Sequence, residues 1–168
     1  APDEVQQIWD AAPVRRSPAE WALRYVWDDP DVDVVLSGMS TMQQLIDNLQ
    51  AAAVAHPPSL SASELAVIEQ VRRVYDERTA VPCTGCRYCM PCPSGIDIPA
   101  TLALMNDASL YGNVQGERFT YKINVDLGNS APASACTECG QCVEACPQQI
   151  AVPEALAECV RLFEAEAP

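Results

Sequence analysis

The sequence has little positive charge, few aromatic residues and no long apolar run. Its 168 residues include 10 basic and 23 acidic side chains, which gives a formal net charge of −13. Nucleic acids and anionic membrane surfaces would repel such a chain, so we expect neither as a partner. No apolar stretch approaches the roughly 18–20 residues that span a membrane, and the acidic start Ala1–Glu4 is unlike an export signal. Hydrophobic residues still make up 49% of the chain, so a packed core is expected.

Histidine and lysine are nearly absent as well. The chain has one histidine, His56, and one lysine, Lys122, and it contains no glycine-rich phosphate-binding motif. Many common acid–base and nucleotide-dependent active sites are therefore hard to build from this chain alone. Cysteine, in contrast, is plentiful, with nine residues.

Eight of these cysteines form two tight clusters, at residues 83–92 and 136–146. Each cluster has three cysteines spaced by two residues and a fourth that is followed by proline. Three such thiolates fit three corners of a [4Fe–4S] cluster, and the fourth leaves the loop in a direction that suits a second cluster. The pattern predicts two [4Fe–4S] clusters that exchange their fourth ligands. The two predicted sets are Cys83, Cys86, Cys89 and Cys146 for one cluster, and Cys136, Cys139, Cys142 and Cys92 for the other.

Three other interpretations of the cysteines are less consistent with this pattern. Disulfides are disfavoured by the close spacing, by the odd total and by the lack of a secretory signal. Zinc sites are an alternative, although zinc knuckles use two cysteines per short loop and each loop here offers four. Free structural thiols at this density have no obvious purpose. The ninth cysteine, Cys159, lies at helical spacing from Leu156 and Phe163, which predicts a buried structural thiol.

The two clusters belong to an internal repeat. The offset is 53 residues for the first three cysteines and 54 for the fourth, and the similarity continues through residues 92–102 and 146–156. In both copies a proline is well placed to begin a helix, which predicts helices from about Pro99 to Tyr111 and from Pro153 to about Ala165. We expect a helical turn or two in residues 112–135. The predicted fold is mainly α, with a helical two-cluster ferredoxin-like module.

Residues 1–80 contain no cysteine and alternate between helix and strand signals. The pattern Ser17–Glu20 predicts a capped helix that ends near Trp27, and Val32–Leu36 is typical of a short buried strand. Ser40 with Gln43 is expected to cap a helix from Thr41 to about Ala55.

A break at His56–Pro58 and a capped helix that begins near Ser61 lead to the first cysteines. A lone parallel strand cannot satisfy its own hydrogen-bonding edges, so the first half should be incomplete without neighbouring strands.

Two stretches of the first half and the cysteine loops together resemble a known family. Residues 16–26 and 34–41 are similar to the end of an aldo/keto reductase barrel, and residues 82–99 with Cys139–Cys142 are similar to a dicluster iron–sulfur extension found on one branch of that family. The resemblance implies that residues 1–55 are the last helix–strand–helix of a (β/α)8 barrel. Residues 56–80 would then be a linker and connecting helix, and residues 81–168 a dicluster domain.

The resemblance also implies a cofactor site. Residues after the last strands of such barrels hold the cofactor phosphate, and this would place five residues near a nicotinamide cofactor, NAD or NADP: Ser37, Gly38, Met39, Ser40 and Asn48. The plainer interpretation stays open, in which Ser37–Gly38 forms a turn and Ser40 caps a helix. The catalytic residues of the family lie on earlier strands, and neither His56 nor Lys122 is placed to replace them, so this chain alone should not catalyse carbonyl reduction.

The leading functional hypothesis is an electron-transfer module of an aldo/keto reductase-like oxidoreductase. The alternatives are a ferredoxin-like subunit that docks on a separate redox enzyme and a zinc-stapled interaction domain. We expect a partner chain or upstream sequence to complete the barrel, and a redox partner with a basic docking face to match the acidic chain. Oxygen-sensitive clusters would favour a cytoplasmic location.

Overall fold

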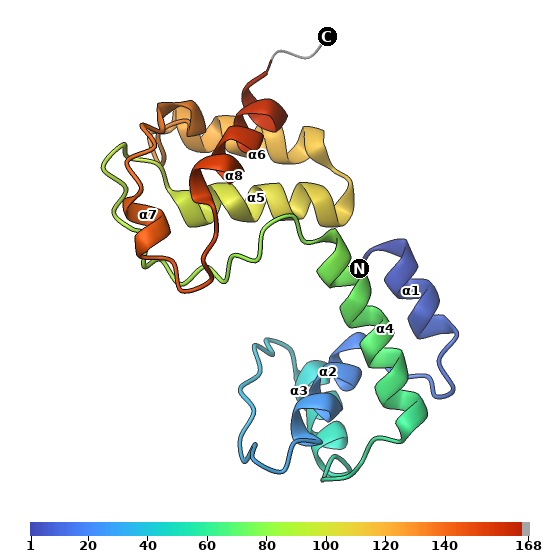
Figure 1. Ribbon diagram of the computed structural model, residues 1–168. Coiled ribbons are helices and arrows are strands. Elements are labelled where there is room, and N and C mark those ends of the chain that lie inside the picture. Colours follow the sequence, from blue (N-terminus) through green and yellow to red (C-terminus); the bar gives the residue numbers. More distant parts are fainter. Residues whose placement is uncertain (166–168) are drawn as a thin grey trace. The chain divides into compact units, whose positions relative to one another are not determined.

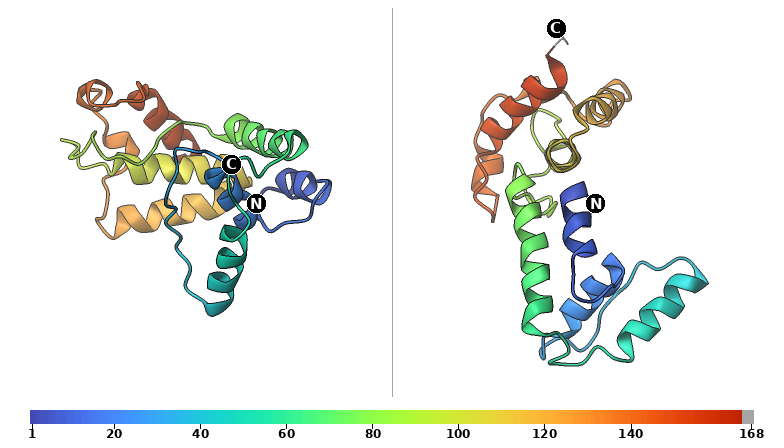
Figure 2. Two further views of the ribbon diagram at one scale, coloured as in Figure 1. Left: turned by 90° about the horizontal axis from the view of Figure 1, so that it is seen from below. Right: turned by 90° about the vertical axis from the view of Figure 1, so that its right-hand side faces the viewer.

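The computed structural model describes residues 1–165, and the helical class predicted from the sequence is confirmed. The chain divides into two compact units, Ala1–Val74 and the part from Tyr75 onward. Figures 1 and 2 show the ribbons of both units. No helix among residues 1–165 is both long and apolar enough to cross a membrane. The predicted division into residues 1–55, 56–80 and 81–168 stays a prediction.

The first unit is built from helices whose ends follow local sequence signals. These are α1 (Asp3–Asp10), α2 (Pro18–Trp27), α3 (Met42–Ala52) and α4 (Ala62–Arg78), whose last turn belongs to the second unit. The predicted cap of α2 is confirmed, because the Ser17 hydroxyl accepts a 3.1 Å hydrogen bond from the Glu20 amide. The helix ends at Trp27, as predicted, and Asp28 is its C-cap residue.

The core of the first unit combines aromatic stacking with a buried ion pair. The rings of Trp9 and Trp21 stack with centroids 5.3 Å apart, and the Arg16 guanidinium lies 4.6 Å above the Trp21 ring. Arg16 also forms an ion pair with Glu64, whose side chain is only 8% exposed. The Ser61 hydroxyl and amide donate hydrogen bonds of 2.7 Å each to Glu64, so the predicted cap at Ser61 is confirmed.

The predicted strand at Val32–Leu36 is wrong. Residues 32–40 contain no strand or helix, and the side chains of Val34 and Leu36 are 77% and 94% exposed. The physical reason is that a strand needs a neighbour, and the described residues supply no other strand with which it could pair. The apolar side chains of this segment therefore have no core against which they could pack.

The start of α3 also differs from the prediction. The cap is Thr41 rather than Ser40, and its partner is Gln44 rather than Gln43. The Gln44 amide donates to the Thr41 hydroxyl at 3.2 Å, and the Gln44 side chain accepts from the Thr41 amide at 3.2 Å. The reciprocal pair needs a spacing of three residues, and this spacing is equally available from Thr41.

The second unit surrounds its core with three longer helices and several short turns. Its elements are α5 (Ile98–Tyr111), α6 (Val114–Asp126), the 3₁₀ turn η1 (Ala133–Ala135), α7 (Gln141–Glu144), α8 (Val152–Cys159) and the π-helical turn η2 (Val160–Glu164). Helices α5 and α6 lie side by side in both figures, and α8 packs against α5.

Three helices of the second unit depart from the sequence predictions. The segment expected to hold a helical turn or two contains the whole 13-residue helix α6, which begins where the Asn113 side chain caps the Gly116 amide. The helix predicted to run from Pro153 to about Ala165 starts at Val152 and changes to π-helical geometry at Val160. Its partner α5 starts at Ile98, one residue before the predicted Pro99.

The internal repeat organises the core of this unit. Residues at equivalent positions are buried in pairs: Ile96 with Ile150, Ile98 with Val152, and Leu102 with Leu156. The next equivalent pair, Met105 and Cys159, meets between α5 and α8, with the two sulfur atoms 3.5 Å apart. Cys159 is completely buried, which confirms its predicted place in the core.

Candidate metal centre

The eight clustered cysteines line two separate cavities in the second unit. The first cavity is bordered by Cys83, Cys86 and Cys89 of the first loop and by Cys146 of the second. The second is bordered by Cys136, Cys139 and Cys142 of the second loop and by Cys92 of the first. Each cavity thus brings three cysteines of one loop together with the last cysteine of the other. Cys89 also borders the second cavity, so it lies between the two sites.

The repeated helices give both cavities an apolar wall. Ile98 at the start of α5 borders both sites. Leu102 of α5 lines the first cavity, and Leu156 of α8 lines the second. Pro99 of α5 and Val152 and Pro153 of α8 also line the cavities, so the first turns of both helices face them. The N-terminal end of a helix stabilises negative charge. Such an end favours the negative charge that four thiolates bring to a cluster.

The backbone of the two loops repeats in its unusual positions. Gly85 and Glu138 are equivalent in the repeat, and both have positive φ, at 68° and 53°. Arg87 and Gly140 are a second such pair, at 65° and 81°. Left-handed residues are uncommon outside glycine, and alternation of right- and left-handed backbone turns successive amides toward one concave site, as in many iron–sulfur loops. This geometry fits a [4Fe–4S] cluster in each loop.

Repeated hydrogen bonds reinforce this correspondence. The Met90 amide donates to the Arg87 carbonyl at 3.0 Å, and the equivalent Val143 amide donates to the Gly140 carbonyl at 2.9 Å. The turns after the last cysteines also match. The Gly95 amide donates to the Cys92 carbonyl at 2.9 Å, and the Gln149 amide donates to the Cys146 carbonyl at 3.1 Å. The similarity of the two loops therefore extends from the ligand spacing to the backbone.

Burial and mutual proximity affect the inner thiols. Burial raises the pKa of Cys89, and the neighbouring Cys83, Cys142 and Cys86 raise it further. Burial likewise raises the pKa of Cys142, with a further contribution from three nearby cysteines: Cys136, Cys139 and Cys92. Because metal ligands are thiolates, occupation of these sites would release protons.

The outermost cysteine of each site is exposed. Cys86 and Cys139 occupy equivalent positions of the two loops, and both are exposed, while the other six clustered cysteines are partly buried. Each cavity therefore has one cysteine at the surface of the unit. Within residues 1–165, no three or more His, Cys, Asp or Glu side chains are arranged to hold a single metal ion.

A polar network that sequence reasoning missed anchors the turn that precedes Cys136 in the second loop. The Tyr121 hydroxyl of α6 contacts the Glu164 carboxylate at 2.5 Å and accepts a 2.6 Å hydrogen bond from the Ala133 amide. The Ser134 amide donates to Glu164 at 3.1 Å. Burial opposes ionisation of Glu164, but the hydrogen bonds from Ser134 and Tyr121 outweigh it and lower the pKa of the carboxyl. These bonds span about 12 to 43 residues of sequence, so no local pattern could have indicated them.

The five residues predicted to border a nicotinamide cofactor lie in the first unit, and three of them meet. The Asn48 side-chain amide donates to the Ser37 hydroxyl at 2.9 Å and lies 3.4 Å from the Met39 sulfur. Gly38 and Ser40 are exposed nearby in sequence. The Ser40 amide donates to the Gln44 side chain at 2.8 Å, so it is already occupied by a bond within the protein.

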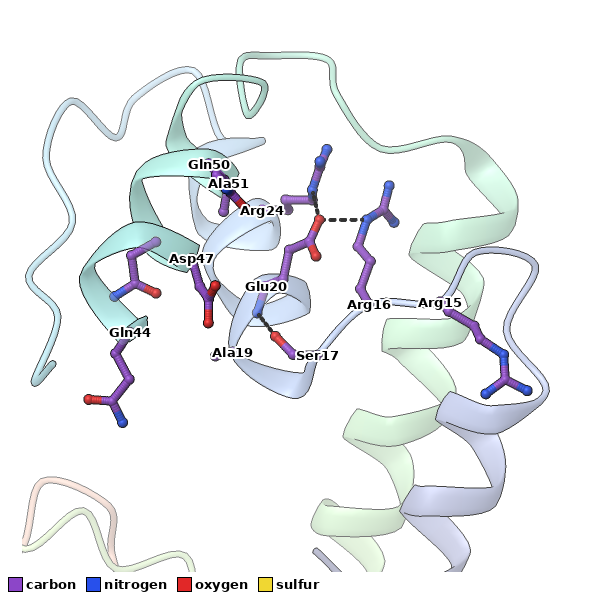
Figure 3. A pocket seen from close by; sticks show the side chains of 11 residues that line it. Arg15, Arg16, Ser17, Ala19, Glu20, Arg24, Gln44, Asp47, Gln50 and Ala51 are labelled. Carbon is purple, nitrogen blue, oxygen red and sulfur yellow. Dashed lines mark hydrogen bonds and ion pairs between the residues drawn. The ribbon is translucent and has the colours of Figure 1, made fainter. Parts of the chain in front are cut away.

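A pocket of about 590 Å³ adjoins this region, bordered by residues of α2 and α3. Figure 3 shows that Glu20 forms ion pairs with both Arg16 and Arg24, while Arg15 lies apart from this group. The distances are 3.2 Å for Arg16 and 2.8 Å for Arg24. Two of the three arginines at the pocket are therefore already paired with carboxylates, Arg24 with Glu20 and Arg16 with both Glu20 and Glu64.

A helical domain with two cysteine-lined cavities and repeated ligand loops has the architecture of a dicluster iron–sulfur domain. Comparison with protein-family models agrees, since residues 82–151 match the 4Fe-4S dicluster domain and residues 3–73 match the aldo/keto reductase family. The two matches occur in the predicted order, the aldo/keto reductase segment first and the 4Fe-4S dicluster domain after it. Searches of curated proteins and of solved structures gave no match.

Proposed function

We propose that this chain is the electron-transfer part of an aldo/keto reductase-like oxidoreductase and that it carries two [4Fe–4S] clusters. The observation that supports this most strongly is the pair of cavities, each of which brings three cysteines of one loop together with the last cysteine of the other. A [4Fe–4S] cluster supplies one-electron redox chemistry when it is bound by four thiolates.

The residues of this chain have three tasks in the proposal. The eight cysteines hold the clusters, and the amides of the left-handed loops offer hydrogen bonds to the sulfur atoms. Ile98, Leu102 and Leu156 keep water from the inner side of each site, and low water access is one determinant of the potential. Cys86 and Cys139, which are exposed, mark the two places where an electron has the shortest path to an outside partner.

The partner and the nicotinamide cofactor belong to the same proposal. The net charge of −13 favours a redox partner with a basic docking face. In a complete barrel, Ser37, Met39 and Asn48 would border the cofactor, and the contacts of Asn48 with the other two support their grouping. Electrons would then pass between the barrel site and the partner through the two clusters.

Paired cysteine variants test the exchanged ligation. In the anaerobically prepared chain, Cys83→Ser and Cys146→Ser should perturb the same EPR signal of the reduced protein. Cys136→Ser and Cys92→Ser should perturb the other signal, because each fourth cysteine serves the loop that is not its own. Cys159→Ser is the matched control and should leave both signals unchanged, since Cys159 lines neither cavity.

The outcomes of this experiment are distinct. If Cys83→Ser and Cys92→Ser perturbed one signal together, each loop would bind its own fourth cysteine and the exchange would be wrong. If the chain contained zinc and gave no EPR signal on reduction, the electron-transfer proposal itself would be wrong and the zinc-stapled alternative would apply.

A further inference from the structure

The internal repeat allows the two cluster sites to be compared position by position, and they differ in charge. Among the residues that line the first cavity, the one charged side chain is Arg87. Among those that line the second, it is Glu138. The equivalent positions in the opposite loop are both glycine, Gly140 for Arg87 and Gly85 for Glu138. The repeat thus places one positive charge at the first site and one negative charge at the second.

We propose that this charge difference gives the two sites unequal reduction potentials, with the first site the higher. The inference rests on the proposed function. Uptake of one electron makes the charge of a site more negative by one unit, which a nearby guanidinium favours and a nearby carboxylate opposes. No atom is transferred in this step. The first electron given to the chain is therefore held at the site of Cys83, Cys86, Cys89 and Cys146.

Neighbouring groups reduce the difference in charge between the two sites. Arg87 is paired with Asp97 at 3.2 Å, so its charge acts as the positive end of an ion pair, and its side chain is 56% exposed to screening water. The Glu138 amide lies 3.4 Å from the Cys136 sulfur and raises the potential of the second site. Gly85 has the same left-handed backbone at the equivalent position, so a similar amide is available at the first site. The side-chain charges have no such counterpart.

A difference in reduction potential between the sites would give electron transfer through the chain a direction. An electron that arrives at the second site passes to the first. The second site is thereby oxidised by one electron, the first is reduced by one electron, and one unit of negative charge moves between them. Cys139 is the exposed cysteine of the second site and Cys86 that of the first. We therefore assign the donor side to the Cys139 loop and the acceptor side to the Cys86 loop.

The repeat also supplies the test, because each variant installs the residue that the other loop already carries. Arg87→Gly and Glu138→Gly both place glycine at a position with positive φ, so neither introduces backbone strain. The experiment is an anaerobic redox titration of the holoprotein followed by EPR. Arg87→Gly should lower the higher midpoint potential, and Glu138→Gly should raise the lower one. Each should change the reduced-to-oxidised ratio of its site by at least about threefold, or about 28 mV for a one-electron couple.

Controls separate this inference from the function on which it rests. Lys122→Gln and Glu154→Gln change the net charge equally but lie outside both cavity linings, so they should leave both midpoints nearly unchanged. The double variant Arg87→Gly/Glu138→Gly should bring the two midpoints together. If both clusters are present and reducible but the gap stays as wide in the double variant, the inference is overturned while the proposed function stands. If no cluster is present, the proposed function fails first.

Discussion

At the residue scale, the most strongly perturbed carboxyl of the first unit is Glu64. Hydrogen bonds from Ser61 lower its pKa to about 2, against an ordinary value of 4.5, and the Arg16 guanidinium adds to the effect. A carboxyl with a lowered pKa in the folded state stabilises the fold above its unfolded pKa. That contribution is lost as the pH falls from about 4.5 toward about 2.

Replacement of this carboxyl should remove the pH dependence it causes. We expect Glu64→Gln to lower the melting temperature of the first unit at pH 7, with a difference from the wild type that shrinks as the pH falls toward 2. The three tryptophans, Trp9, Trp21 and Trp27, all lie in the first unit, so their fluorescence reports on it alone. Glu69→Gln on the same helix is the control, since its side chain is 45% exposed and should contribute little. A difference that stayed constant down to pH 2 would contradict the assignment.

The thiol of Cys159 shows how far single residues could be predicted. Its helical spacing from apolar neighbours was enough to place it in the core, and burial raises its pKa to about 12, with neighbouring Glu158 and Glu164 adding to the rise. The ion pair of Arg87 with Asp97 had no such signal. It joins Arg87, which has a left-handed backbone, to Asp97, the N-cap residue of α5. No local sequence pattern indicates either feature.

At the scale of elements, local signals predicted helix starts well and pairings poorly. Ser17 and Ser61 cap the helices they were expected to cap, because a cap depends on residues three positions apart. Helix α6 was underestimated, because its only clear start signal is Asn113 and it follows no proline. The strand at Val32–Leu36 failed for a different reason, since a strand depends on partners elsewhere in space.

The contact between Tyr121 and Glu164 should matter for the loop that it anchors. Tyr121→Phe removes the hydroxyl that accepts from the Ala133 amide and contacts Glu164, and it leaves a buried amide without its partner. The expected cost is about 1–3 kcal/mol, concentrated at the turn that leads into Cys136. The second site should then lose iron to a chelator several times faster than the first, as followed by absorbance and EPR.

Tyr111→Phe provides the matched control for this experiment. Its side chain is 56% exposed at the end of α5, so the same chemical change should leave both sites unaltered. Equal rates of iron loss from the two sites in Tyr121→Phe would show that the network does not support the second loop.

At the scale of the whole molecule, the two units should depend on the clusters to different degrees. The second unit surrounds two cysteine-lined cavities, and metal binding supplies much of the ordering free energy of small metal domains. The first unit has its own core of stacked tryptophans and a buried ion pair. Removal of iron should therefore leave the region before about residue 80 unchanged and expose the region beyond it.

Limited proteolysis compares the two states of the full chain. The apoprotein should be cleaved beyond about residue 80 at least tenfold faster than the holoprotein, because unfolding of the loops exposes the backbone. The cleavage sites in residues 1–74 serve as the internal control and should react at the same rate in both states. Equal resistance of the second unit with and without iron would contradict this expectation.

In the proposed function, each of the two cysteine-lined cavities holds one [4Fe–4S] cluster. The most direct test is to measure iron, acid-labile sulfide and zinc in the anaerobically purified chain, together with EPR after reduction. We expect about eight iron and eight sulfide ions per chain, no zinc, and a signal from two reduced clusters. Zinc at about two ions per chain, with neither sulfide nor an EPR signal, would contradict it.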